Sequence, residues 1–336
     1  MTAHHSCPSF PHFRRAGLTR PEFRLCLAMT ARPIRPEELD ACCAIGGGPG
    51  LAETVRKLWQ EGNCSPDLCF MVERDGRPVG WTFFFHPHST INFYLCRLHI
   101  DGSVDHVEAG RALLGLAADT ARRAGAADIG YAIYDIYDPS PARTQQLLEA
   151  RGFKQIQTKR RYVWQDPGTA VEVPARLEFR SLSTVGESAY TEALGLVTEA
   201  TLDREDQADI ARYGLAAAGP KYLALLRDLE FLPDEWQLAC LPDGRLCGLV
   251  VPQAIEFGSE GAINYIGVVP ELRGSGYGFD LLLKGSAQLL RRGLKTVVAE
   301  TDVENLPLHT HLERASYIHR GTLQNFRLLL QQPTDT

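Results

Sequence analysis

The residues best suited to chemistry are three glycines at alternate positions, Gly274, Gly276 and Gly278, with Arg273 directly before them. Glycine carries no side chain, so the backbone can curl tightly here and several N–H groups can converge on one point. A helix that begins at this point would add the positive end of its dipole to the charge of Arg273. The spacing therefore predicts a binding site for an anion such as a diphosphate.

Two elements must position this loop. The apolar run at residues 263–269 predicts a β-strand before it, and the leucine-rich segment after it has helical spacing. The predicted buried face of this helix carries Phe279, Leu282, Leu283, Ala287 and Leu290, and the predicted exposed face carries Asp280, Lys284, Gln288 and Arg291. The order strand, glycine loop and helix is typical of phosphate-binding sites.

The segment Val268-Val-Pro-Glu-Leu-Arg-Gly-Ser-Gly-Tyr-Gly278 resembles the Arg-x-x-Gly-x-Gly acyl-CoA signature of the GCN5-related N-acetyltransferase (GNAT) superfamily. The resemblance implies acetyl-CoA as the co-substrate, with its diphosphate held by Arg273, Gly274, Ser275, Gly276, Tyr277 and Gly278. It also implies that a backbone N–H at Val268 or Val269 polarises the thioester carbonyl, and that Asn305 contacts the pantetheine arm. Asn305 equally fits a plain helix N-cap.

Two alternatives compete for the glycine loop. The simplest is a turn that only connects a strand to a helix. The other is a dinucleotide-binding fingerprint with Glu300 as the ribose-binding acid, which requires Gly-x-Gly-x-x-Gly directly after the strand. Here residues 270–273 intervene, so the acyl-CoA interpretation is favoured.

The resemblance implies attack of a neutral amine on the thioester, which requires a group that takes a proton from an ammonium. Glu300, at the end of the predicted strand 295–301, is our candidate base. An ion-paired or solvated Glu300 without this role is the alternative. Glu256 and Glu260, on or beside the preceding hairpin, are further candidates.

The sequence departs from the family pattern at the general acid. Many members have a Tyr before the Glu of the last helix, whereas this chain has Leu312 before Glu313. His309, His311 or Tyr265 can substitute, or the thiolate can leave unassisted or take a proton from solvent. The departure keeps a non-catalytic acyl-CoA-binding or sensor protein as the alternative to an enzyme.

The chain repeats itself. Asp75-Gly-Arg-Pro-Val-Gly80 recurs 168 residues later as Asp243-Gly-Arg-Leu-Cys-Gly248, and each contains an Asp-Gly turn that predicts a hairpin. Two further landmarks recur in the same order at similar offsets, 110–114 with 278–282 and 148–153 with 312–317.

From this duplication we predict an α/β fold of two tandem acetyltransferase-type domains, each a mixed twisted sheet flanked by helices. The predicted domains span residues 29–168 and 175–332, after a loosely ordered extension at 1–28, with Met29 as an alternative start. In the second half we expect strands near 176–182, 236–241, 245–256, 261–269, 295–301 and 317–329.

The two copies differ at the glycine loop. Asp105 stands where the second half has Arg273, and Glu108 stands where it has Gly276. Two carboxylates would repel a diphosphate, and the Glu108 side chain would fill the space into which the backbone must close. We therefore expect the first copy to be degenerate, to bind no CoA, and to shape one wall of the substrate cleft.

Composition narrows the partners. A formal net charge of -6 over 336 residues argues against nucleic acid, and no apolar stretch approaches the length of a membrane span. Nine scattered cysteines without a Cys-x-x-Cys pair indicate reduced thiols in a cytoplasmic protein, and we predict no metal site. We expect a monomer or homodimer that acts on a small-molecule amine.

The segment from Gly186 to Asp234 sets acceptor choice, as the resemblance implies. Its acidic run at residues 203–209 fits either a receptor for a cationic amine or a solvated helix face. The predicted function is transfer of an acetyl group from acetyl-CoA to a primary amine of a small molecule or peptide by direct attack.

Overall fold

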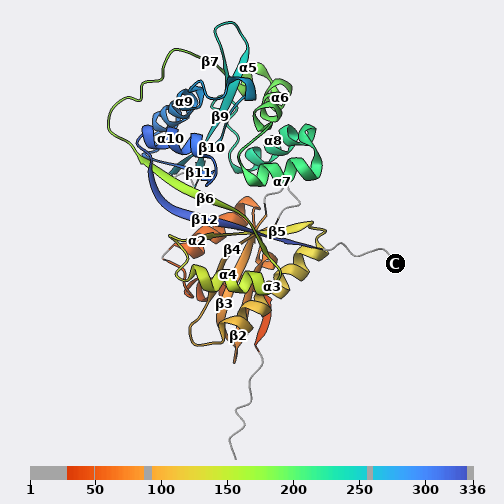
Figure 1. Ribbon diagram of the computed structural model, residues 1–336. Helices are drawn as coiled ribbons and strands as arrows, with labels where there is room; N and C mark the ends of the chain where they lie inside the picture. The colour runs from red at the N-terminus through yellow and green to blue at the C-terminus, as the bar shows by residue number, and fades with distance from the viewer. Residues whose placement is uncertain (1–28, 49, 87–92, 256–259, 331–336) are drawn as a thin grey trace, which may run out of the picture.

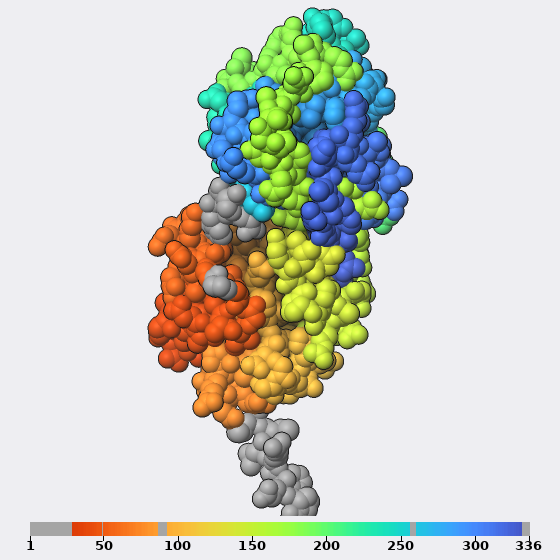
Figure 2. Space-filling view, turned by 90° about the vertical axis from the view of Figure 1, so that its left-hand side faces the viewer, coloured from red at the N-terminus to blue at the C-terminus, as the bar shows by residue number. Residues whose placement is uncertain are grey.

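The computed structural model describes residues 29–48, 50–86, 93–255 and 260–330. Their strands form one 12-stranded sheet in the order β1-β2-β3-β4-β5-β12-β6-β11-β10-β9-β8-β7. The two halves lie end to end along this sheet (Figure 1). Figure 2 shows the same arrangement from the side, with the first half in red to yellow and the second in green to blue. The predicted extension at 1–28 lies outside the described residues.

The first half alternates strands with helices. It begins with β1 (Thr30–Pro33), η1 (Pro36–Glu38), α1 (Leu39–Cys43), α2 (Leu51–Glu61) and η2 (Pro66–Leu68). It continues with β2 (Cys69–Arg74), β3 (Arg77–Phe85), β4 (Phe93–Ile100), α3 (His106–Arg123), β5 (Asp128–Tyr134), α4 (Pro141–Ala150) and β6 (Lys154–Gln165).

The second half repeats this order with additional helices. It begins with β7 (Glu178–Ser181), α5 (Leu182–Val185), α6 (Glu187–Thr198), α7 (Arg204–Tyr213), η3 (Leu215–Ala217) and α8 (Ala218–Leu229). It continues with β8 (Gln237–Cys240), β9 (Leu246–Ile255), β10 (Glu260–Val268), η5 (Pro270–Leu272), α9 (Tyr277–Arg291), β11 (Thr296–Asp302), α10 (Leu306–Arg314) and β12 (Ile318–Leu329). All the strands predicted for this half are present within two residues of their expected ends.

The last strand of each half is exchanged with the other half. β12 pairs antiparallel with β5 of the first half, and β6 pairs antiparallel with β11 of the second half. β6 and β12 also pair with each other at the centre of the sheet (Figure 1). The two predicted domains are thus consecutive in sequence but interleaved in the sheet.

The duplication is visible in the strand register. Phe93 on β4 lies opposite Ile129 on β5, and 168 residues later Gly261 on β10 lies opposite Val297 on β11. These two strand pairs are parallel, whereas the other pairs are antiparallel, so the sheet is mixed as predicted. Both predicted Asp-Gly hairpins are present, between β2 and β3 and between β8 and β9.

Helices cover both faces of the sheet in the second half. α9 and α10 pack on one face, over a core that includes Leu281, Leu289 and Leu312. α6 and α8 pack on the opposite face, around Tyr190 and Trp236 (Figure 1). Within the described ranges, the structure contains no helix with the length and apolar character needed to cross a membrane.

The predicted faces of α9 are wrong at two positions. Asp280 is 0% exposed and Gln288 is 3% exposed, although the polarity pattern predicts that both face solvent. Asp280 is neutralised by Arg176, which binds its Oδ2 at 2.8 Å, and Gln288 donates to the carboxylate of Glu235 at 3.0 Å. A helical pattern ranks residues by polarity and carries no information about partners from distant segments.

Candidate functional site

A split opens in the sheet between the parallel strands β10 and β11. They pair at only two positions, the second of which sets Ala262 opposite Val298. Directly afterwards the register of β10 against β9 shifts between Ile263 and Tyr265. A bulge of this kind bends a strand and ends its regular pairing. Beyond Ala262, β10 therefore runs to the glycine loop without β11 beside it.

Backbone donors face this split. Val269 donates its N–H to the carbonyl of Cys247 on β9 at 2.9 Å, so it is not available to a ligand. Because N–H groups alternate in direction along a strand, those of Val268 and Ile266 point away from β9 and into the split. Of the two predicted carbonyl-polarising residues, Val268 is thus the one that the geometry favours. Ile266 is a second donor that the sequence analysis did not identify.

The glycine loop has the shape of an anion-binding cradle. Gly274 and Gly276 have φ of 77° and 81°, in the left-handed region that glycine adopts without strain. Gly276 is the N-cap of α9 and supplies no side chain to its first turn. Within the described ranges, no backbone carbonyl accepts the N–H groups of residues 274–278. These donors lie at the positive end of the helix dipole, where a diphosphate is favoured.

Arg273 is directed away from this cradle. Its guanidinium donates to the carbonyls of Val197, Glu199 and Ala200 at 3.0, 2.6 and 2.8 Å, and its Nε donates to that of Val268 at 3.0 Å. The first three carbonyls lie at the C-terminal end of α6, where helical partners are missing. The side chain of Arg273 therefore ties the glycine loop to α6, instead of adding its charge to the cradle.

Arg176 is the cation that lies beside the loop, and the sequence analysis did not identify it. Its guanidinium donates to the carbonyls of Ser275 and Gly276 at 3.4 and 3.3 Å. It also lies over the ring of Tyr277, 5.1 Å from the centroid, while it neutralises Asp280. No short-range sequence pattern could predict this contact, because the loop lies about a hundred residues after Arg176.

Asn305 has the geometry of a helix N-cap. Its side-chain oxygen accepts the N–H of Leu308 at 3.3 Å, in the first turn of α10. This is one of the two interpretations that the sequence leaves open. Its contact with a pantetheine arm remains a prediction.

The residues proposed as substitute acids lie at different distances from the loop. His311 contacts the first turn of α9, because a Cβ added at Gly278 would meet its ring at 3.1 Å, and burial lowers its pKa. His309 is buried with its Nε2 unbonded within the described ranges. Tyr265 faces the α6 side of the sheet, and Leu312 fills the core under α9. His311 is therefore the substitute that the structure places at the glycine loop.

A cavity of about 470 Å³ lies between the two halves, next to the split. Glu300 lines it, and its carboxylate accepts from Arg161 at 2.8 Å and from the Tyr134 hydroxyl at 3.5 Å. Arg161 also binds Glu260 at 3.0 Å. The candidate base is ion-paired, yet it faces a cavity beside the expected thioester. Of the two further candidates, Glu260 is ion-paired with the same Arg161, and Glu256 lies outside the described residues.

The exchanged strand β6 brings side chains of the first half to this site. Arg161 lies opposite Glu300, and Lys159 lies opposite Asp302. No role was predicted for the run Lys159-Arg160-Arg161, although Lys and Arg inside a sheet are almost never buried without a partner. That run was the available signal, and only the strand order shows which carboxylates it meets.

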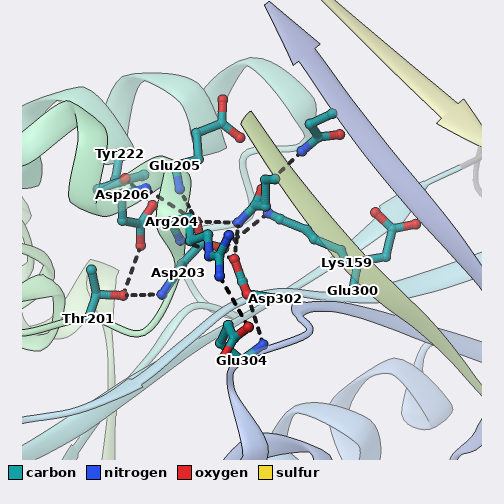
Figure 3. Close-up of polar contacts among 12 residues, drawn as sticks. Lys159, Thr201, Asp203, Arg204, Glu205, Asp206, Tyr222, Glu300, Asp302 and Glu304 are labelled. Carbon is teal, nitrogen blue, oxygen red and sulfur yellow. Dashed lines mark hydrogen bonds and ion pairs between the residues drawn. The ribbon is translucent and has the colours of Figure 1, made fainter. Parts of the chain in front are cut away.

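The acidic run of α7 is not a solvated helix face. Asp203 caps α7 and forms an ion pair with Lys159 of β6 at 3.1 Å. Asp206 accepts the hydroxyl of Tyr222 on α8 (Figure 3). Burial, together with the neighbouring Asp203 charge, raises the pKa of Asp206 to about 7. Asp203 thus joins α7 to β6 and Asp206 joins it to α8, so both acids already have partners within the protein.

The corresponding split in the first half is filled by a tyrosine. Tyr131 stands on β5 at the position of Ala299 on β11, and it is 7% exposed. Its hydroxyl accepts the N–H of Leu98, which stands at the position of Ile266, at 3.3 Å. Burial raises the pKa of this phenol. The Tyr131 ring thus fills the split between β4 and β5, and its oxygen occupies the Leu98 N–H. In the second half, the corresponding split and the Ile266 N–H remain open.

The loop of the first half is closed as well. Asp105 is the N-cap of α3, and its carboxylate accepts the N–H of Glu108 at 2.8 Å. A donor that corresponds to the cradle at Gly276 is therefore used within the protein. This geometry supports the prediction that the first copy binds no CoA.

Comparisons with known proteins agree with this geometry. Residues 205–315 match the family model described as the acetyltransferase (GNAT) family. The GCN5-related N-acetyltransferase from Sphaerobacter thermophilus superposes with a TM-score of 0.65 at 18% identity, over 92% of this chain and 98% of that one. A tandem GNAT protein from the clavulanic acid biosynthesis pathway superposes with a TM-score of 0.55 at 15% identity, over 91% and 100%. No curated protein sequence matches the chain.

Residues 205–315, within the second half, therefore carry the pattern of the acetyltransferase (GNAT) family. The chain as a whole shares its fold with the GNAT structures on which it superposes. Its mixed sheet flanked by helices is the tandem form of that fold, as predicted. The match of residues 205–315 supports acyl transfer at the level of the family.

Proposed function

We propose that this protein is an N-acetyltransferase that moves an acetyl group from acetyl-CoA to a primary amine of a small molecule or peptide by direct attack. The single acetyl-CoA site lies in the second half. A cytoplasmic location and a monomeric or homodimeric state belong to the same proposal.

The observation that carries the proposal is the open split between β10 and β11. It presents the N–H groups of Ile266 and Val268 and leads to the cradle at residues 274–278. A thioester carbonyl in the split would accept one of the strand donors, while the diphosphate would bind the loop and the dipole of α9.

In this mechanism the amine nitrogen forms the new C–N bond as the C–S bond breaks. Glu300 takes the proton that the amine loses, and Arg161 holds its carboxylate at the cavity wall. The thiolate takes a proton from His311 at the glycine loop or from solvent. Backbone donors polarise the carbonyl, so no metal is required for this step.

The test is acetyl-CoA binding, measured by calorimetry, to the intact chain and to the variant Gly276→Glu. At Gly276 the new residue would adopt a left-handed φ and place a carboxylate at the cradle, which copies Glu108. Gly244→Glu is the matched control, because Gly244 has φ of 87° and a Cβ there would meet no atom within 4 Å.

We expect one site per chain in the intact protein and in Gly244→Glu, and affinity at least about tenfold lower in Gly276→Glu, a loss of about 1.4 kcal/mol. Two sites per chain would show that Tyr131 does not close the first split. No binding at all would overturn the proposed function.

A non-catalytic acyl-CoA-binding protein is the second candidate. Two observations favour it: Leu312 replaces the family Tyr in the core, and Glu300 is ion-paired. Thiol release from acetyl-CoA, measured with a panel of amines, separates the two. Binding without thiol release across the panel would support this candidate.

A further inference from the structure

The wall of the cavity between the halves carries a cation, Arg97, and an anion, Glu300, which come from different halves. We propose that the acetyl acceptor is an elongated zwitterion, whose amine lies at Glu300 and whose anionic group, such as a carboxylate, binds Arg97 of the first half. This inference rests on the proposed function, because it concerns the acceptor side of the same site.

Arg97 provides the cationic group. It lines the cavity from β4 and has φ of 56°, in the left-handed region that a long side chain rarely adopts. Residues held in such conformations cluster at ligand-binding sites. The guanidinium lies over the ring of Tyr137, 5.5 Å from its centroid. Among the residues that the structure describes, Arg97 has no ion-pair partner.

Asp138 also lines the cavity but leaves the guanidinium available. Its Oδ1 accepts the backbone N–H of Ser140 at 2.7 Å, and it forms no ion pair with Arg97 within the described ranges. A guanidinium with free N–H groups binds a planar carboxylate through two parallel hydrogen bonds. The geometry at Arg97 therefore suits an anionic group of the ligand.

The group around Glu300 is anionic. Glu300 and Glu260 both bind Arg161, whose side chain is 7% exposed, so this group of three has a formal net charge of -1. Lys159, a further cation of the cavity wall, is already paired with Asp203. An ammonium beside Glu300 would balance the remaining charge, next to the split where the thioester is expected.

Two tyrosines connect the two charged groups. The ring centroids of Tyr137 and Tyr134 are 5.7 Å apart, and the Tyr134 hydroxyl reaches Glu300 at 3.5 Å. Together with the contact between Arg97 and Tyr137, these steps limit the separation to roughly 18 Å at most, which an extended peptide of up to about five residues spans. A short peptide with a free amine and a free carboxylate is thus the simplest ligand of this class.

The test compares peptides of two to five residues that have a free C-terminal carboxylate with the same peptides as C-terminal amides. Acetyl transfer is followed as thiol release, with the intact chain and with Arg97→Gln. We expect the free acids to have KM values at least about tenfold lower than the amides. Arg97→Gln should remove this difference without changing acetyl-CoA affinity, and Arg97→Lys should retain part of it.

Arg123→Gln is the matched control. Arg123 lies on α3, where its guanidinium donates to Thr120 at 3.1 Å, away from the cavity lining. It should leave the preference for free acids unchanged. If acetyl-CoA binds but no peptide is acetylated, calorimetry with CoA present decides: binding of the acids that depends on Arg97 supports the inference, and no such binding overturns it.

The remaining outcomes separate the two proposals. Equal KM values for acids and amides, or an Arg97→Gln enzyme that still prefers acids, would overturn the zwitterion inference and leave the proposed function intact. Faster transfer to polyamines than to any peptide acid would do the same. Failure to bind acetyl-CoA would overturn the proposed function itself.

Discussion

Glu300 and Arg161 come from opposite halves of the chain and meet at 2.8 Å. Arg161 is 7% exposed and also binds Glu260, so it keeps one carboxylate partner when the other is removed. At the scale of single residues, a few contacts shape the glycine loop and the two splits. Arg176 forms an ion pair with Asp280, Tyr131 accepts the Leu98 N–H, and Arg273 donates to the carbonyls at the end of α6. Each joins segments that are far apart in the sequence.

Replacing Glu300 by Gln should remove the proposed base and leave acetyl-CoA binding intact. Loss of a positioned general base typically lowers the rate by about 10²- to 10⁴-fold. The measurement is kcat by thiol release, alongside acetyl-CoA affinity by calorimetry. Glu304→Gln is the matched control, because Glu304 is an exposed carboxylate that pairs with Arg204 two residues after β11. An unchanged kcat in Glu300→Gln would remove this residue from the mechanism.

At the scale of elements, α6 and α7 are fastened to the sheet by polar groups. Arg273 binds the C-terminal carbonyls of α6, and Asp203 binds Lys159 of β6. Asp206 and Tyr222 join α7 to α8 (Figure 3). These contacts hold the helices that flank the split, so changes to α7 should act on stability before they act on chemistry.

Asp206 should make stability depend on pH. Its folded pKa is about 7, above the ordinary value of 3.8, so the unfolded chain loses this proton first as pH rises. The stabilisation is full below about pH 4 and is lost as pH rises through about 7. The variant Asp206→Asn has no carboxyl group that titrates at this position. As pH rises from 4 to 8, the intact protein should therefore lose free energy of unfolding relative to the variant, by the order of a few kcal/mol. Urea unfolding of both proteins at the two pH values measures this. Parallel pH profiles would show that Asp206 is ionised in the folded protein at low pH.

At the scale of the whole molecule, the exchange of β6 and β12 makes the two halves interdependent. β12 completes the sheet beside β5, and β6 completes it beside β11. The cavity with Glu300 and Arg97 exists only because both halves build its walls. The first copy, which we propose binds no CoA, therefore forms one wall of the site and supplies Arg161.

Cutting the chain in the segment between β6 and β7 should test this dependence. We expect residues 1–168 and 169–336, produced separately, to be unstable as monomers, because each lacks the strand that covers an edge of its sheet. Produced together, they should form a stable 1:1 complex that binds acetyl-CoA. Light scattering and circular dichroism measure both results. A stable, folded monomer from either fragment alone would show that the exchanged strands can return to their own half.

The sequence by itself determined the order of the elements, the duplication and the strand–glycine loop–helix motif, because these depend on local spacing. The strand alternation, the Asp-Gly turns and the glycines at 274–278 are short-range signals. The inequality of the copies at Asp105 and Glu108 was also readable, since aligned repeats can be compared residue by residue.

Only the tertiary structure decided which side chains meet. Arg161 with Glu300, Arg176 with Asp280 and Tyr131 in the first split all depend on strand order and on burial. Helical and strand periodicity report which face of an element is apolar, but not which distant segment lies against it. For that reason the buried Asp280 and the exchange of β6 and β12 lay beyond sequence reasoning, because both are set by pairing across more than one hundred residues.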